Sequence, residues 1–228
     1  MRRSIIAVLS LALFALVPAF AQIPPNASEL SAYRGLHAAA ARGDIAAIGA
    51  LFAQGAEAGA RDPYQRTPLH VAAYQARHDA MRALAIGGAD PNALEADRYD
   101  IVTIAAVAND LPTLALALEL GTNPKNVTSR YDGTALIAAA HLGHHEVVRM
   151  LIKAGAPLDH VNNLGWTALI ESIVLGDGGP RHLATLRALV DAGANVNLAD
   201  GQGRTPLTLA RAHGYREMVR ILQEAGAR

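Results

Sequence analysis

The stretch TALIAAAHLGHHEVVRMLIKAGA, residues 134–156, contains the pattern that decides the fold. Thr134 is suited to begin a helix, because its hydroxyl can accept a backbone N–H that has no partner inside the helix. Gly143 separates this first segment from EVVRMLIKAG (146–155), whose apolar residues recur at helical spacing. Gly155 can adopt the left-handed conformation that ends a helix. The stretch therefore contains two segments that suit short helices, one on each side of Gly143.

The same pattern recurs along most of the chain. Its first halves are TPLHVAA (67–73), TALIAAA (134–140), TALIESI (167–173) and TPLTLAR (205–211), with weaker copies at RGLHAAA (34–40) and DIVTIAA (100–106). Successive copies begin 33, 33, 34, 33 and 38 residues apart, and the last step is longer because DGGPR (177–181) is inserted. Such a period is typical of a solenoid, in which each repeat buries its apolar side against its neighbours.

These segments resemble the ankyrin-repeat family, most clearly in TPLH (67–70), GHHEVVRMLIKAGA (143–156) and DAGANVN (191–197). The resemblance implies an all-α fold, an ankyrin-repeat α-solenoid of about six helix-turn-helix repeats with short β-hairpin connections. The repeats would occupy residues 34–66, 67–99, 100–133, 134–166, 167–204 and 205–228, within a domain of residues 30–228. A short N-terminal segment, residues 22–29, would precede that domain.

The first 21 residues are typical of an export signal. Arg2 and Arg3 precede an apolar run over residues 5–17, and Ala19 and Ala21 form the small-x-small pattern that signal peptidase cleaves. The apolar run is shorter than the roughly 20 residues that a membrane-spanning helix needs. We therefore expect residues 1–21 to be a signal peptide and the mature protein to be periplasmic, with full secretion as the other outcome.

The composition and motifs of the chain limit the kinds of ligand that it is expected to bind and the reactions that it is expected to catalyse. Removal of residues 1–21 would leave 18 basic residues against 20 acidic ones, so no basic surplus favours binding to nucleic acid or to an anionic membrane. The chain has no cysteine, so its stability must come from packing. Neither a nucleophile elbow, a phosphate loop nor an HExxH pattern occurs. We expect a binding protein without enzymatic activity and without a cofactor.

Three histidines in HLGHHEV (141–147) raise the question of a metal site. On one continuous helix, His141, His144 and His145 would share a face, but the resemblance to ankyrin repeats places Gly143 at the turn between two helices. We therefore expect no metal. By their positions in the repeat, histidines 37, 70, 144 and 182 are expected to bridge neighbouring repeats through hydrogen bonds, and histidines 78, 145 and 160 to be ordinary surface residues.

The resemblance also implies where a partner would bind. Ankyrin repeats commonly recognise partners on the concave surface that the hairpin tips and the ends of the first helices form. Aromatic side chains are frequent at these positions here, and interface hot spots are rich in Trp, Tyr and Arg. The predicted protein-binding residues are Tyr64, Arg66, Tyr74, Gln75, Asp97, Tyr99, Arg130, Tyr131, His141, Asn163, Trp166, Arg204 and His213. The alternative for Tyr99 and Trp166 is packing against the adjacent hairpin.

Two binding functions fit these features, and an enzyme whose site the sequence does not reveal is the third reading. The first is an exported module that captures a partner protein, of the stress-protection or inhibitor and immunity type, in the periplasm. The alternative is a secreted effector that binds host proteins outside the producing cell. Polar residues at both ends of the repeat array favour a monomer. The DGGPR insertion is either a second contact site or a tolerated loop.

Overall fold

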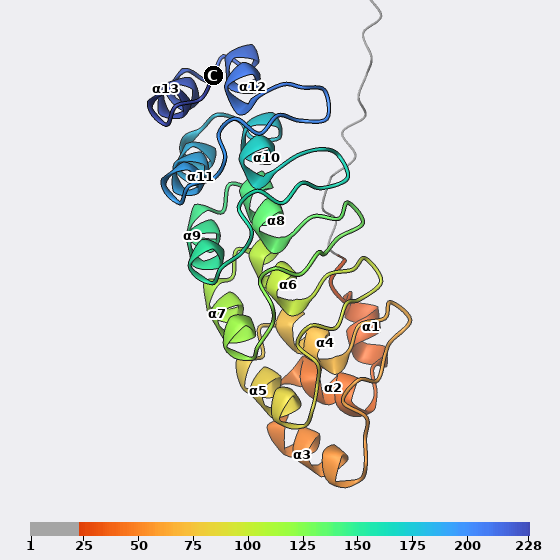
Figure 1. The fold of residues 1–228 in the computed structure, drawn as a ribbon. Helices are drawn as coiled ribbons and strands as arrows, with labels where there is room; N and C mark the ends of the chain where they lie inside the picture. Colours follow the sequence, from red (N-terminus) through yellow and green to blue (C-terminus); the bar gives the residue numbers. More distant parts are fainter. Residues whose placement is uncertain (1–22) are drawn as a thin grey trace, which may run out of the picture.

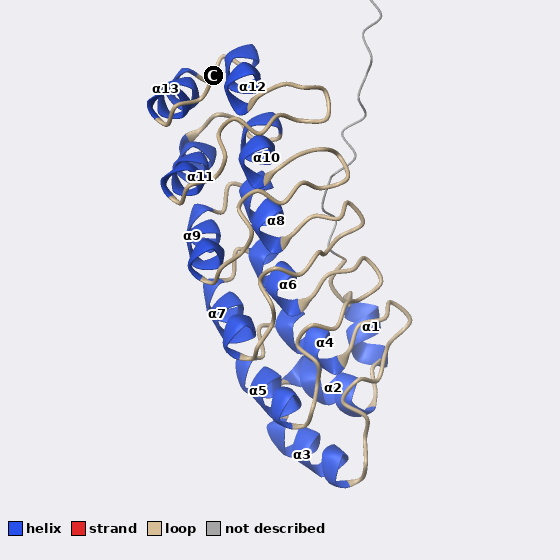
Figure 2. Ribbon diagram, viewed as in Figure 1, coloured by secondary structure: helices blue, strands red, loops and turns tan. Residues whose placement is uncertain are grey.

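The structure, a computed structural model, describes residues 23–228. The expected signal peptide, residues 1–21, lies outside the described residues. The described part contains thirteen helices and no strands, apart from one isolated bridge between Thr128 and Gly133. The all-helical solenoid predicted from the repeats is confirmed, whereas the β-hairpin connections are tight turns without strand pairing (Figure 2). None of the helices in residues 23–228 is long and apolar enough to cross a membrane.

The helices form two curved rows, with the connecting loops projecting from one side (Figure 1). A short helix, α1 (Ala27–Ala32), precedes both rows. The inner row is α2 (Gly35–Arg42), α4 (Pro68–Tyr74), α6 (Ile101–Ala108), α8 (Ala135–His141), α10 (Ala168–Val174) and α12 (Pro206–Ala212). The outer row is α3 (Ile45–Ala53), α5 (His78–Ile86), α7 (Leu111–Glu119), α9 (His145–Lys153), α11 (Pro180–Asp191) and α13 (Arg216–Glu224).

Side-chain caps set where the inner helices begin. Thr134 and Thr167 accept the backbone N–H of the residue three positions on, at 3.4 and 3.2 Å. In the third repeat Asp100 takes this role and accepts from the backbone and the hydroxyl of Thr103, both at 2.8 Å. Asp100 therefore caps its helix as threonine does in the fourth and fifth repeats, because its carboxylate accepts a backbone N–H that has no partner inside the helix.

The core is one continuous layer between the two rows. Alanines of the inner helices, such as Ala72, Ala105 and Ala139, are almost fully buried and let successive inner helices pack closely. Leu136 and Leu151 fill the space between α8 and α9. Each repeat therefore buries its apolar side against the next, as a solenoid requires.

The turn at residue 143 confirms the predicted break between the helices. Helix α8 ends at His141, α9 begins at His145, and Gly143 has a positive φ of 68°. A Cβ at this position would also lie 3.2 Å from the ring of His182 in the next repeat. Both the backbone conformation and the close approach of the neighbouring repeat therefore favour glycine at this position.

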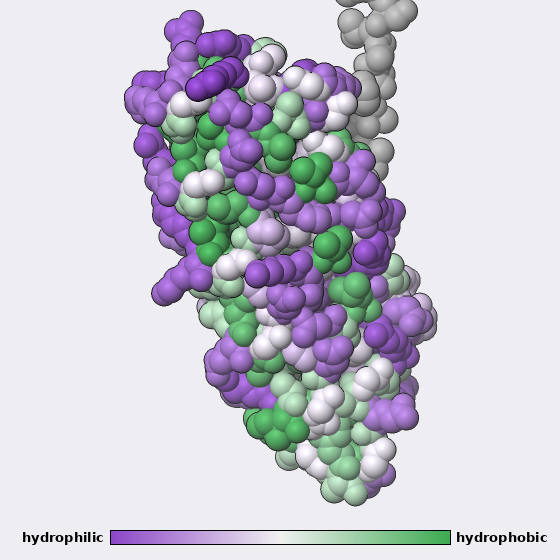
Figure 3. All heavy atoms as spheres, in the orientation of Figure 1, coloured by the Kyte–Doolittle hydropathy of each residue, from purple (hydrophilic) through white to green (hydrophobic). Residues whose placement is uncertain are grey.

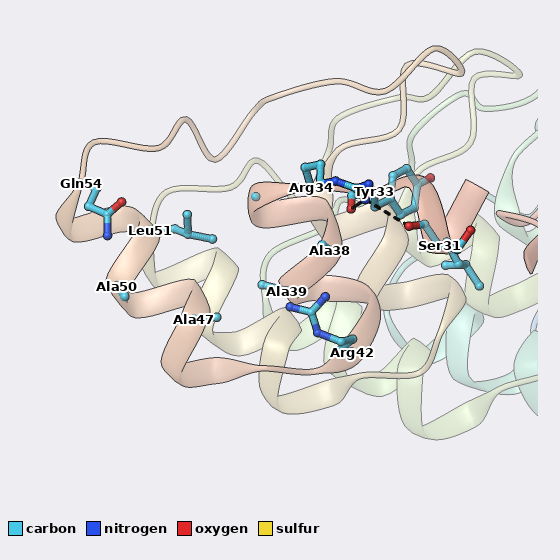
Figure 4. Close-up of a pocket in the computed structure, with 12 residues that line it drawn as sticks. Ser31, Tyr33, Arg34, Ala38, Ala39, Arg42, Ala47, Ala50, Leu51 and Gln54 are labelled. Atoms are coloured by element: carbon cyan, nitrogen blue, oxygen red, sulfur yellow. Dashed lines mark hydrogen bonds between the residues drawn. The ribbon is translucent and has the colours of Figure 1, made fainter. Parts of the chain in front are cut away.

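The two ends of the described stack differ in polarity. At the C-terminal end α13 exposes charged residues, including Arg216, Glu217 and Arg220. At the N-terminal end α3 carries no charged or polar side chain, and α1 lies against α2 beside it. A surface pocket of about 670 Å³ opens between these helices, lined by small apolar residues and by Arg34 and Arg42 (Figure 4). The C-terminal end therefore carries its polar residues on its last helix, whereas at the N-terminal end the exposed polar residues, such as Ser28, Ser31 and Arg34, come from α1 and the start of α2.

The DGGPR insertion lengthens the turn between α10 and α11, supplies the first two residues of α11 and packs against the last repeat. The Tyr215 hydroxyl donates to the Gly176 carbonyl at 2.8 Å, and a Cβ on Gly178 would lie 2.4 Å from the Tyr215 ring. Asp177 contacts His182 Nδ1 at 2.8 Å and accepts from the Gly179 amide at 2.9 Å. The insertion thus forms part of an interface between repeats.

Candidate protein-binding groove

Five tight turns, here called fingers, project from the inner row toward one side. They are finger 1 (residues 62–66), finger 2 (95–99), finger 3 (129–133), finger 4 (162–166) and finger 5 (200–204). In finger 1, Asp62 Oδ1 accepts the backbone N–H groups of Tyr64 at 2.9 Å and Arg66 at 2.8 Å. The equivalent acceptors in the other fingers are Glu95, Ser129, Asn162 and Asp200. One side chain therefore fixes the shape of each finger.

This geometry gives two positions in each finger different surroundings. The residue two positions after the acceptor lies at the tip, where Tyr64 is 42% exposed and Leu164 is 45% exposed. The residue four positions after the acceptor lies at the base, where Arg66 is 1% exposed and Tyr99 is 4% exposed. In fingers 1 and 2 the side chain at the base is therefore buried, whereas in finger 5 the side chain of Arg204 at the base is 42% exposed.

Backbone hydrogen bonds join the first four fingers into a continuous wall. The amides of Ala96, Ser129 and Asn163 donate to carbonyl oxygens of the preceding finger, at 2.9, 3.2 and 2.9 Å. Fingers 2 and 3 are also joined by two ion pairs, Arg98 with Asp132 at 2.7 Å and Arg130 with Asp97. The wall is therefore ordered before any partner binds, which lowers the entropic cost of association.

The predicted contact residues fall into three groups by exposure. Tyr64, Arg130, Asn163 and His213 are exposed. Tyr74, Gln75, Asp97, Tyr131, His141, Trp166 and Arg204 are half-buried, and Trp166 packs against the core. Arg66 and Tyr99 are buried, which corrects their expected placement on the surface.

Arg66 is buried because the N-terminal segment folds over it. Its guanidinium pairs with Glu29 of α1 and with Asp62 of its own finger, each at 2.7 Å, and it lies 4.5 Å from the centre of the Tyr64 ring. Burial alone would raise the pKa of the Asp62 carboxyl, but hydrogen bonds from Tyr33 and Arg66 hold that pKa below its ordinary value. The network ties α1 to finger 1.

Two of the four histidines expected to bridge repeats do so: His144 and His182 contact backbone carbonyls of the preceding repeat at 3.0 and 2.9 Å. The bridging role expected of His37 and His70 is wrong, because they contact the carbonyls of Arg66 and Ala93, at 2.9 and 3.0 Å, within their own repeats. Burial lowers the pKa of His70 to about 4, so it acts as a neutral hydrogen-bonding residue. The surface role expected of His78 and His160 is wrong, since each also spans two repeats. Residues 23–228 contain no group of three or more His, Cys, Asp or Glu that could hold a metal ion.

A buried polar cluster lies between finger 4 and the inner helices α8 and α10. Glu171 stands where most other inner helices carry an apolar residue, and its carboxylate accepts from Asn162 at 2.8 Å and lies 3.3 Å from His141 Nδ1. Burial raises the pKa of Glu171, although His141 and Asn162 partly offset the increase. The cluster joins finger 4 to two inner helices.

Sequence reasoning missed three exposed apolar residues on the finger side. Leu164 is the tip residue of finger 4, and Val127 and Val161 lie just before fingers 3 and 4. On the face shown in Figure 3, apolar side chains form small separate patches that are surrounded by polar side chains. Counting from the acceptor residue of each finger would have identified Leu164, because it shares the register of Tyr64 and Tyr131.

Known proteins share this arrangement. The protein-family model described as ankyrin repeats (3 copies) matches residues 10–98 and 102–200. A second family model, described as ankyrin repeats (many copies), matches residues 180–223. An ankyrin repeat domain from Acinetobacter baumannii AYE, known from its crystal structure, is 44% identical, with a TM-score of 0.79 over 85% of this chain and 98% of that domain. The chain therefore belongs to the ankyrin-repeat family.

Two further relatives show how widely the array occurs. The ankyrin repeat protein YahD of Escherichia coli strain K12 is 32% identical over 190 residues, covering 83% of this chain and 94% of that protein. The B-cell lymphoma 3 protein homolog of Mus musculus is 30% identical over 200 residues, covering 84% of this chain but only 44% of that protein. Ankyrin repeats are protein-interaction modules, and the fold is typically a scaffold without enzymatic activity.

Proposed function

We propose that this chain is an exported, monomeric protein without enzymatic activity that captures a partner protein in the groove between the fingers and the inner helices. The observation that supports this most directly is the presence of Tyr64, Tyr131 and Leu164 at the tips of three of the first four fingers, which are joined to one another by their backbones. An ordered wall with apolar anchors is the arrangement expected of interface hot spots.

In the capture experiment, the full mature chain, residues 22–228, is immobilised and then incubated with a periplasmic extract. A retained protein is then purified and its affinity measured. The double variant Tyr131→Ser and Leu164→Ser is expected to weaken binding by at least about 2 kcal/mol, the scale of a hot spot. Ile86, which is 89% exposed at the end of α5 and far from the fingers, provides the matched control Ile86→Ser. Equal affinities of the two variants would contradict the groove as the binding surface.

Export is tested separately from binding. Cells that produce the full-length chain are separated into cytoplasm, periplasm and medium, and the size of the chain is measured by mass spectrometry. Export predicts a periplasmic chain that begins at Gln22. Accumulation in the medium would favour the secreted effector, and an uncleaved cytoplasmic chain would refute export. Light scattering of the purified mature chain tests the monomer.

A further inference from the structure

The outer helix at the N-terminal end of the described stack is covered on one side only. Helices α5, α9, α11 and α13 each pack against the outer helix of the preceding repeat. Among the helices of residues 23–228, α3 packs chiefly against α2 and α5, whereas α1 packs against α2. The position that an outer helix occupies before α5, α9, α11 and α13 is therefore open before α3.

The surface left open beside α3 is apolar. Helix α3 has the sequence IAAIGALFA and carries no charged or polar side chain. Ala47, Ala50 and Leu51 lie at helical spacing along α3 and line the pocket of about 670 Å³, together with Leu30 of α1 and Ala38 of α2. Ala50 is exposed, and Leu51 is half-buried. Because the end repeats of a solenoid normally turn a polar face to solvent, an open apolar surface at this end indicates an interaction site.

Two arginines, but no described aspartate or glutamate, line this pocket. Arg34 and Arg42 are exposed, and neither forms an ion pair within residues 23–228. In Figure 4, Arg34 lies at one end of the pocket and Arg42 at the other. The Arg34 Nη1 donates to the carbonyl oxygens of Ala32 at 2.9 Å and Tyr33 at 2.7 Å, so this guanidinium is held in place. The pocket therefore favours a ligand that combines an apolar surface with negative charge.

We propose that this open end binds an α-helix of a partner protein, with an apolar face against α3 and acidic residues beside Arg34 and Arg42. A helix fits because helices occupy the same position before four other outer helices. Symmetric pairing with a second copy would bring the arginines of the two copies close to one another. Head-to-tail pairing would place the charged residues of α13 on an apolar surface. This end of the stack is distinct from the fingers, so the proposal goes beyond the groove.

The test uses the mature chain, residues 22–228, and a stapled helical peptide as the probe. One face of the peptide carries alanine and leucine, and glutamates border that face. In the matched peptide the glutamates are replaced by lysines. In amide NMR spectra the glutamate peptide is expected to shift the amides of Ala47, Ala50 and Leu51, while the amides of the fingers stay in place. It should bind at least about tenfold more tightly than the lysine peptide.

A change of charge at Arg42 separates the site from nonspecific attraction. Arg42→Glu should weaken binding of the glutamate peptide at least about tenfold and strengthen binding of the lysine peptide. Arg187 of α11 is also exposed and also forms no ion pair in the described part of the chain. The matched control Arg187→Glu should therefore change neither affinity.

A second pair of variants tests the apolar surface. Ala50→Glu places a carboxylate in the pocket and should abolish binding of the glutamate peptide. Ala46 is exposed on the same helix without lining the pocket, so Ala46→Glu should leave binding unchanged. Shifts confined to the fingers, or equal affinities for the two peptides, would overturn the proposal. A dimer in light scattering, or binding to phosphatidylglycerol vesicles, that Ala50→Glu abolishes would also overturn it, because a second copy or a lipid surface would then cover α3.

Discussion

Two arginines at the same finger position show how surroundings decide a residue's role. Arg66 and Arg204 both pair with the acidic acceptor of their own finger. Arg66 is covered by α1 and is 1% exposed, whereas the side chain of Arg204 is 42% exposed. The sequence could not separate them, because Glu29, which covers Arg66, lies 37 residues earlier in the chain. Such a contact is visible only once the N-terminal segment is placed.

Substitution of these two arginines is therefore expected to change the free energy of unfolding by different amounts. Arg66→Ala leaves Glu29 and Asp62 without their buried cation and should lower the free energy of unfolding by about 3 kcal/mol. Arg204→Ala breaks a partly exposed pair and should cost less than about 1 kcal/mol. Urea unfolding at neutral pH measures both changes. Similar losses for the two variants would show that the burial of Arg66 does not control its contribution.

At the scale of the element, the sequence pattern was sufficient to predict the helices, but it predicted only part of the structure of the fingers. Threonine caps and the glycine turns fix the helix ends through local interactions, so the sequence pattern was sufficient. The fingers were recognised, but aromatic residues at the tip and at the base were treated alike. Tyr99 and Trp166 occupy the base and pack inward, while Tyr64 and Leu164 occupy the tip. The prediction from sequence did not consider which position each aromatic residue occupies within its finger.

The acceptor at the start of each finger should control its rigidity. Asn162→Ala removes the acceptor for the amides of Leu164 and Trp166 and the donor to Glu171. Hydrogen exchange of those two amides should accelerate by about tenfold or more, the equivalent of roughly 1 to 2 kcal/mol. Ser129→Ala should have a smaller effect in finger 3, because its contacts are longer, 3.3 and 3.4 Å. A larger effect in finger 3 would contradict this explanation.

At the scale of the whole molecule, stability is expected to be a sum of repeats and of interfaces between neighbouring repeats. The period of the sequence predicted this arrangement, because each copy carries the same apolar positions. The structure adds that the insertion in the fifth repeat contributes to the last interface, where Gly178 lies against the ring of Tyr215. No pattern within the insertion indicated this contact, since Tyr215 belongs to the next repeat.

The last interface can be weakened at one position of the insertion. Gly178 has a φ of 66°, and a Cβ there would lie 2.4 Å from the Tyr215 ring, so Gly178→Ala must displace that ring. Gly203 has a φ of 76° with open space around it, and Gly203→Ala therefore carries only the backbone strain of about 1 kcal/mol. The clash should add about 1 to 3 kcal/mol. Because each repeat contacts only its neighbours, hydrogen exchange should accelerate in α12 and α13 while α4 and α5 stay protected. Uniform acceleration along the array would instead indicate that the six repeats unfold as a single cooperative unit.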